Sequence, residues 1–243
     1  VGLASVAVKE ARERVRSAIK NSGFDFPNRK IIVNLAPADF KKEGSHFDLA
    51  IAVGILAATG QLGREFTGNF FLAGELSLNG AVRAVPGILP MTLELEGMSP
   101  ELCFLVPQEN SAEAALVKEV VSYRISHLTD IGNFINNQQP LQKINYHENN
   151  HLFQPETNIP DFSEVKGQEN AKRALQIAAA GLHNVLLIGP PGGGKTMLAR
   201  RMPGILPEMT RQEVLATTRI YSVANLLDSN SPLITRRDRK SVV

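Results

Sequence analysis

The sequence contains one cysteine, Cys103, among its 243 residues. A single cysteine excludes an internal disulfide framework and fits a reducing compartment, so we expect a cytoplasmic protein. Cys103 lies in the apolar run Leu102–Val106. A thiol in such a run is expected to be a buried core residue rather than a reactive one.

No apolar stretch reaches the roughly 18 consecutive residues that a membrane-spanning helix needs, and we therefore expect no membrane partner. The opening residues, Val1-Gly2-Leu3, lack the charged start, apolar core and cleavage site of a secretory signal. They also lack an initiator methionine, so we expect this chain to be a piece of a longer protein.

The residues that are present are typical of a soluble, folded chain, with 43% hydrophobic and 21% charged side chains. The length fits one large domain or two ordinary ones. The formal net charge of +2 neither favours nor opposes nucleic-acid binding. The last part of the chain, 197–243, is more basic, which gives weak support to DNA as a partner. Its charged residues are Arg200, Arg201, Arg211, Arg219, Arg236, Arg237, Arg239 and Lys240 against Glu208, Glu213, Asp228 and Asp238.

Residues 1–132 alternate predicted helices and strands, as in an α/β protein. Apolar residues at helical spacing predict a helix over 8–19 that Ser22-Gly23 ends. We expect Asp48 to cap a buried apolar helix, and Asn79-Gly80 to form a two-residue hairpin turn. Further predicted helices lie at 49–59, 88–96 and 111–118, and predicted strands at 31–35, 70–74, 102–106 and 122–126.

Asparagine, glutamine and proline accumulate between residues 133 and 161, where apolar periodicity fades. This composition predicts a linker between two domains rather than a core element. His147 and His151 lie in it, and we interpret them as solvated residues rather than a zinc site. After the linker, the pattern predicts a helix over 168–180 and a buried strand at 184–188.

The chemistry of the chain is concentrated in one motif, G-x-x-x-x-G-K-[ST], which follows that strand and opens a helix. Its residues are Gly189, Pro190, Pro191, Gly192, Gly193, Gly194, Lys195 and Thr196. Glycines let backbone N–H groups point at phosphate oxygens, and the helix N-terminus adds partial positive charge. The motif therefore predicts ATP as a ligand, with Lys195 on the β- and γ-phosphates and the Thr196 hydroxyl on Mg²⁺.

A P-loop ATPase also needs an acidic residue at the end of a second strand. None of the acids after Thr196 follows an apolar run of the kind that such a strand would show. We therefore name no catalytic residue, and hydrolysis by this chain stays open.

The segment Phe162–Leu175 and the P-loop resemble the start of an AAA+ module, in which Val165 and Gly167 would flank the adenine. Met197–Arg201 and Gly204–Pro207 are similar to the magnesium-chelatase branch of that superfamily. In the first half, Val8–Arg16, Asn34–Asp39 and Lys42–Gly44 resemble the bacterial ComM/YifB family.

This resemblance covers about residues 1–237 and implies a fold, an assembly and a role. It implies a Lon-protease-like (ribosomal S5 domain 2-like) α+β domain at 1–132, a linker at 133–161 and the N-terminal part of an AAA+ α/β domain at 162–243. It also implies a homo-hexamer whose ATPase drives DNA branch migration in natural transformation. The family's opening strands are absent before Val1, and Asp238–Val243 departs from its pattern.

The Lon resemblance makes a Ser-Lys peptidase an alternative. His46 stands where that family has its nucleophile, and Pro86-Gly87-Ile88 leads to Leu89 where it has its lysine. Ser45 could act only as a displaced nucleophile. We therefore expect no proteolysis. Two further alternatives are a magnesium-chelatase ATPase subunit and an AAA+ remodeller of protein complexes.

Overall fold

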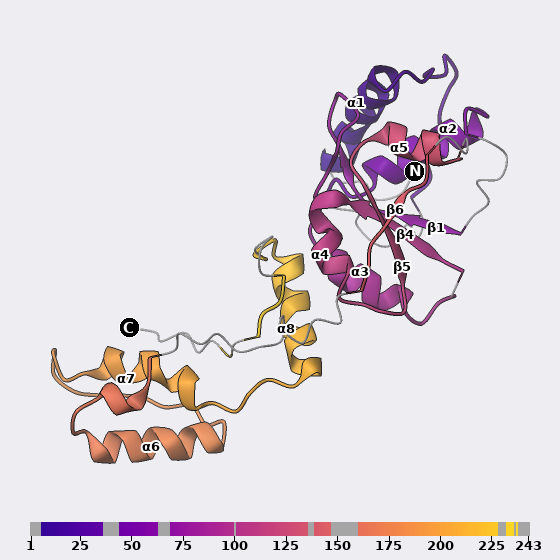
Figure 1. Cartoon of the computed structure of the whole chain (residues 1–243). Helices are drawn as coiled ribbons and strands as arrows, with labels where there is room; N and C mark the ends of the chain where they lie inside the picture. The colour runs from indigo at the N-terminus through magenta and orange to yellow at the C-terminus, as the bar shows by residue number, and fades with distance from the viewer. Residues whose placement is uncertain are drawn as a thin grey trace. The chain divides into compact units, whose positions relative to one another are not determined.

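The computed structural model describes residues 6–35, 44–62, 69–99, 101–135, 139–146, 160–227, 232–235 and 237. The chain divides into two compact units, which are described separately (Figure 1). The first comprises residues 1–148 and 219–232, and the second 149–218 and 233–243. Across the described ranges no helix is both long and apolar enough to cross a membrane.

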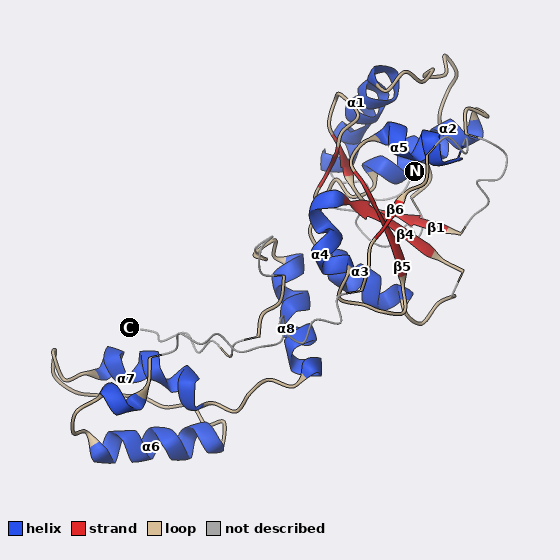
Figure 2. Ribbon diagram, in the orientation of Figure 1, coloured by secondary structure: helices blue, strands red, loops and turns tan. Residues whose placement is uncertain are grey.

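The first unit contains a mixed sheet in the order β1-β4-β5-β6 (Figure 2). Its strands are β1 (Phe70–Leu72), β4 (Cys103–Pro107), β5 (Val121–Ile125) and β6 (Gln142–Lys143). The first three run parallel, with Leu72 opposite Leu105 and Leu105 opposite Tyr123, and β6 pairs antiparallel with β5. Parallel strands are covered on both faces, which explains why β4 is buried almost throughout. The α/β fold class is confirmed.

Three helices share one core with this sheet. They are α1 (Val6–Asn21), α2 (Asp48–Ala58) and α5 (Leu128–Ile135). The core includes Val15, Ile19, Leu49, Leu56, Leu105, Ile125, Leu128 and Ile131. The unit also contains two shorter helices, α3 (Ile88–Leu95) and α4 (Ser111–Ala114).

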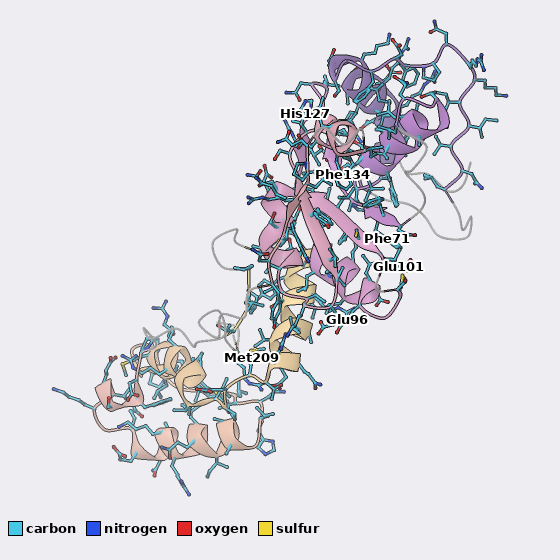
Figure 3. All side chains as sticks on the ribbon, turned by 45° about the vertical axis from the view of Figure 1, so that its right-hand side comes forward. Phe71, Glu96, Glu101, His127, Phe134 and Met209 are labelled. Atoms are coloured by element: carbon cyan, nitrogen blue, oxygen red, sulfur yellow. The ribbon has the colours of Figure 1, made fainter. Side chains whose placement is uncertain are left out.

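Aromatic rings fix α5 against the sheet. Phe134, labelled in Figure 3, meets Phe70 of β1 edge-on with ring centroids 6.1 Å apart. Its centroid lies 6.4 Å from that of Tyr123 on β5. These separations are within the range of favourable aromatic pairs. The end of α5 therefore belongs to the core.

The predicted linker needs correction in its first part. Residues 133–135 continue α5, and β6 adds a strand to the sheet. Ile135 and Leu141 pack against the core of the first unit. The sparse apolar residues of this stretch are sufficient for an edge strand, since an edge strand needs only one neighbour. Residues 136–138 and 147–159, which include His147 and His151, lie outside the described residues.

The predicted hairpin is present, but its turn is longer than expected. β2 (Glu75–Leu76) pairs antiparallel with β3 (Val82–Arg83). Ser77 donates its N–H to the Ala81 carbonyl at 2.9 Å, which leaves a three-residue loop with Gly80 at φ 91°. A type I turn closed by a left-handed glycine has this form. A Cβ on Gly80 would lie 2.2 Å from the Ser22 hydroxyl oxygen, so the position requires glycine.

Two predicted strands are not formed. Residues 31–35 and 184–188 are both without strand structure, and no described strand pairs with either segment. Ile32 is 67% exposed, and Leu186 and Ile188 are 81% and 86% exposed. The prediction of a buried strand at 184–188 is therefore wrong for this chain. β-branched residues favour an extended backbone, but a strand also needs a neighbour to complete its hydrogen bonds.

The second unit packs helices around a small core. Its elements are η3 (Phe162–Glu164), α6 (Glu169–Ala180), α7 (Lys195–Arg201) and η4 (Met202–Ile205), and α8 (Arg211–Val223) begins within it. The core residues are Val165, Leu175, Ala178, Ala179, Leu198 and Met202. The predicted helix over 168–180 is confirmed, with its first helical residue at Glu169.

A buried ion pair joins α1 to α2. Asp48 does not cap α2 as predicted, because Phe47 occupies the N-cap position. Its carboxylate instead accepts the Arg14 Nε at 2.7 Å and Nη2 at 3.2 Å, and the Leu76 N–H at 3.4 Å. Asp48 is 1% exposed. The hydrogen bond to Asp48 raises the pKa of Arg14 above its usual value.

We expect Arg14→Met to lower the free energy of unfolding by about 3 kcal/mol, because it leaves the Asp48 carboxylate buried without its cation. Urea unfolding followed by circular dichroism measures this. The control is Arg12→Met on the same helix, whose side chain is 82% exposed. An equal loss from both variants would contradict a special role for the buried pair.

The start of α8 carries a capping box. Thr210 Oγ1 accepts the Glu213 N–H at 3.3 Å, and Glu213 Oε2 accepts the Thr210 N–H at 2.8 Å. Arg237 Nη2 donates to Glu213 Oε1 at 2.6 Å. The Arg237 hydrogen bond, followed by those from Thr210, lowers the pKa of Glu213 from 4.5 to about 2.

This shift predicts a pH-dependent stability. A lowered folded-state pKa contributes stability that is complete above about pH 4.5 and is lost as the pH falls toward 2. Glu213→Gln should therefore be less stable than the parent chain at pH 7 and equal to it near pH 2, as urea unfolding across that range would measure. Glu208→Gln, at an exposed position without these partners, is the control. A difference that stays constant with pH would contradict the assignment.

Candidate nucleotide-binding site

The predicted P-loop forms a tight turn that leads into α7. The Gly193 N–H bonds to the Pro190 carbonyl at 3.3 Å, with Pro191 and Gly192 between them. Gly192 has φ 79°, as the third position of a type II turn requires. A Cβ on Gly193 would lie 3.2 Å from the Pro190 oxygen. The loop is therefore built for glycine, which keeps side chains out of a phosphate cradle.

Lys195 folds back over this loop. Its Nζ donates to the carbonyl of Gly189 at 2.9 Å and to that of Pro190 at 2.8 Å. Thr196 follows in the first turn of α7 and is exposed. Gly194 stands at the N-cap with φ 79°, so the loop enters the helix through a left-handed residue. The ammonium group thus lies at the N-terminal end of α7, where an anion would bind.

The two residues expected to flank adenine lie on a turn that contacts the P-loop. Val165 is buried in the core of the second unit, so its backbone rather than its side chain is available to a ligand. Gly167 and Gln168 are consecutive left-handed residues, with φ 68° and 62°. Gln168 Nε2 donates to the Gly193 carbonyl at 3.4 Å. The fold therefore brings both parts of the candidate site together.

Arg201, at the end of α7, is a basic residue to which the sequence patterns assign no role in this site. Its Nε donates to the Asp161 carbonyl at 2.9 Å, its Nη1 donates to the Met197 carbonyl at 3.1 Å, and its Nη2 is paired with Glu164. Ser163 and, to a smaller extent, Arg201 lower the pKa of Asp161. No periodicity connects Arg201 with Glu164 across 37 positions, so only the folded chain reveals the contact.

The acids considered for hydrolysis are not placed at the P-loop by the described residues. Glu213 is engaged in the cap of α8, and Glu208 is exposed. Asp228 and Asp238 lie outside the described residues. In the described part of the chain there is no group of three His, Cys, Asp or Glu side chains suited to a metal ion.

The first unit holds the residues considered for peptidase chemistry. The Ser45 hydroxyl donates to the Glu75 carboxylate. Ile88 and Leu89 are fully buried where the Lon resemblance would require a lysine. Lys42 lies outside the described residues.

Cys103 is not the buried core thiol that the sequence predicts. It begins β4 and is only partly buried, because it stands at the end of the strand. Partial burial raises the pKa of its thiol.

Comparison with known proteins places these features in one class. A family model for subunit ChlI of Mg-chelatase matches residues 1–110, and a second, for magnesium chelatase, subunit ChlI, matches residues 161–241. Together the matches define a magnesium-chelatase-like protein. Individual proteins also match the chain, over both its N-terminal and its C-terminal half.

The chain is 45% identical to competence protein ComM of Haemophilus influenzae over 232 residues, which cover 92% of this chain and 44% of that protein. It is 45% identical to the uncharacterized protein YifB of Salmonella typhimurium, over 93% of this chain and 43% of that protein. The chain belongs to the ComM/YifB family. It spans less than half the length of these curated relatives.

A shorter similarity concerns a protease. The chain is 42% identical to an archaeal Lon protease of Methanothermobacter thermautotrophicus over 73 residues, which are 30% of this chain and 10% of that protein. This similarity is consistent with the α/β fold of the chain.

Proposed function

We propose that the second unit binds ATP with Mg²⁺ and forms part of an AAA+ ATPase. The observation that carries this proposal is the P-loop itself, a glycine turn that opens α7 with the Lys195 ammonium folded over it. Membership in the ComM/YifB family supports an ATPase of this type. The proposed phosphate-binding loop comprises Gly189, Pro190, Pro191, Gly192, Gly193, Gly194, Lys195 and Thr196, and Val165 and Gly167 would lie beside the adenine.

The chain's own groups would do three things in this site. Backbone N–H groups of the loop and the N-terminus of α7 donate to phosphate oxygens. Lys195 exchanges the Gly189 and Pro190 carbonyls for the β- and γ-phosphates. The Thr196 hydroxyl holds Mg²⁺, which neutralises phosphate charge when bound. Of the described acids after Thr196, Glu213 is engaged in the cap of α8 and Glu208 is exposed, so we assign no catalytic acid, and hydrolysis belongs to the proposal for the longer protein.

The division of the chain is part of the same proposal. We propose that the Lon-like domain predicted at 1–132 extends through α5 and β6, that the connecting segment follows β6, and that the ATPase domain begins at 162. We also propose that the Lon-like domain does not cleave peptides. The Ser45 hydroxyl is bound to a carboxylate, and buried Leu89 stands near the position of the family's lysine.

Lys195→Ala should weaken ATP binding by at least about tenfold, because it removes a charged donor from the phosphates. Isothermal titration of the chain with ATP and Mg²⁺ measures the affinity. Arg173→Ala is the matched control, since it removes one positive charge from an exposed position on α6. Unchanged affinity in Lys195→Ala would refute the proposed site.

For the longer protein we propose a cytoplasmic homo-hexamer that uses ATP to remodel DNA by branch migration. This role rests on the ComM/YifB family, and the DNA partner comes from that resemblance. A magnesium-chelatase ATPase subunit and a remodeller of protein complexes remain the alternatives. The first is favoured by the family-model matches, and the second by the AAA+ likeness alone.

A branch-migration assay on a synthetic four-way DNA junction distinguishes DNA remodelling from the two alternatives. The full-length protein should move the junction only when ATP is present, and Lys195→Ala should abolish the product, while Arg173→Ala retains it. Gel separation of the fluorescent products measures the conversion. ATP hydrolysis without any movement of the junction would count against DNA remodelling and in favour of the alternatives.

A further inference from the structure

We infer that Arg201 is a positioning residue that holds the adenine side of the nucleotide site, an inference that rests on the proposed ATP site. The base-side turn, defined here as residues 161–168, carries Val165 and Gly167. Arg201 belongs to α7, the helix that the P-loop opens. It therefore ties the turn that would face the base to the helix that would bind the phosphates.

The contacts of Arg201 use all three guanidinium nitrogens. Two of them reach the beginning of the base-side turn, at the Asp161 carbonyl and the Glu164 carboxylate. The third is anchored on the helix itself, at the Met197 carbonyl. The Arg201 side chain is only 16% exposed although it is charged. A guanidinium held this way has one orientation, since its planar donors are fixed relative to each other.

Packing supports the same placement from the apolar side. Val165 is 2% exposed and lies in one cluster with Leu198 and Met202, while Phe162 packs against that cluster. The apolar residues fix how closely the turn approaches α7, but hydrophobic contacts are not directional. The hydrogen bonds of Arg201 supply the direction, because they fix the backbone at Asp161.

The other end of the turn is tied to the P-loop by Gln168. Its amide donates to the Gly193 carbonyl, and its backbone is left-handed although it is not glycine. The base-side turn is therefore held at its beginning by Arg201 and at its end by Gln168. Loss of Arg201 frees the first of these ends, while the contacts of Lys195 with the loop stay intact.

This arrangement predicts that Arg201 contributes more to the binding of the base than to the binding of the phosphates. Arg201→Ala should weaken the binding of ATP about tenfold and change the binding of inorganic triphosphate less than about twofold. Arg201→Lys, which keeps a cation for Glu164, should recover part of the affinity for ATP. Arg200→Ala is the matched control, because it removes the same charge from an exposed neighbouring position on α7.

Titration of each variant with Mg²⁺-ATP and with Mg²⁺-triphosphate gives the ratio of the two affinities, and thermal unfolding reports any loss of fold. Glu164→Gln is a milder change at the side chain that pairs with Arg201. It should also weaken the binding of ATP more than the binding of triphosphate. An equal loss for both ligands, or no loss for either, would overturn the role of Arg201 while leaving the P-loop proposal standing. If the parent chain binds neither ligand, the proposed site fails and the inference fails with it.

Discussion

The Asp48 carboxylate is buried in an apolar core, where an ionised group is stable only beside a cation and hydrogen-bond donors. Arg14 and the Leu76 N–H supply these. The three residues come from α1, α2 and the hairpin, so one carboxylate fixes the mutual placement of three elements. Val15, Ile19 and Leu49 pack in the core of the same unit, but apolar packing by itself does not specify a single orientation. The pair therefore adds a directional contact that the apolar core of the first unit does not supply.

In the second unit, too, polar contacts fix the positions of elements around an apolar core, and this core is smaller. Few apolar residues hold α6 and α7 together, and the P-loop between 189 and 194 is mostly exposed. Polar contacts therefore decide how its parts meet. Arg201 and Gln168 bring the base-side turn to α7 and the loop, as Lys195 brings its charge to the loop carbonyls. A nucleotide site needs both parts in fixed positions, since phosphates and base bind at different ends of one ligand.

Two segments have the residue types that favour β-strands but do not form strands. Residues 31–35 and 184–188 have the β-branched and apolar composition of strands. Neither has a partner strand among the described residues, and their apolar side chains are exposed in places, as at Ile188. Strand propensity is local, whereas a ladder is completed only by a second segment. The chain spans less than half the length of the relatives it matches.

The sequence alone determined the α/β class, most helices, the hairpin position, the P-loop and the ComM/YifB family. These depend on local patterns, namely apolar spacing, glycines at tight turns and a motif whose residues are consecutive. Only the tertiary structure decided that Asp48 pairs with Arg14 instead of capping α2, that Gln142–Lys143 forms an edge strand, and that Arg201 holds the base-side turn. These contacts join residues 18 to 40 positions apart, as at Arg124 and Gln142 or Arg201 and Asp161. No local pattern encodes which distant partner a charge or a backbone edge will meet, because packing of the whole unit makes that choice.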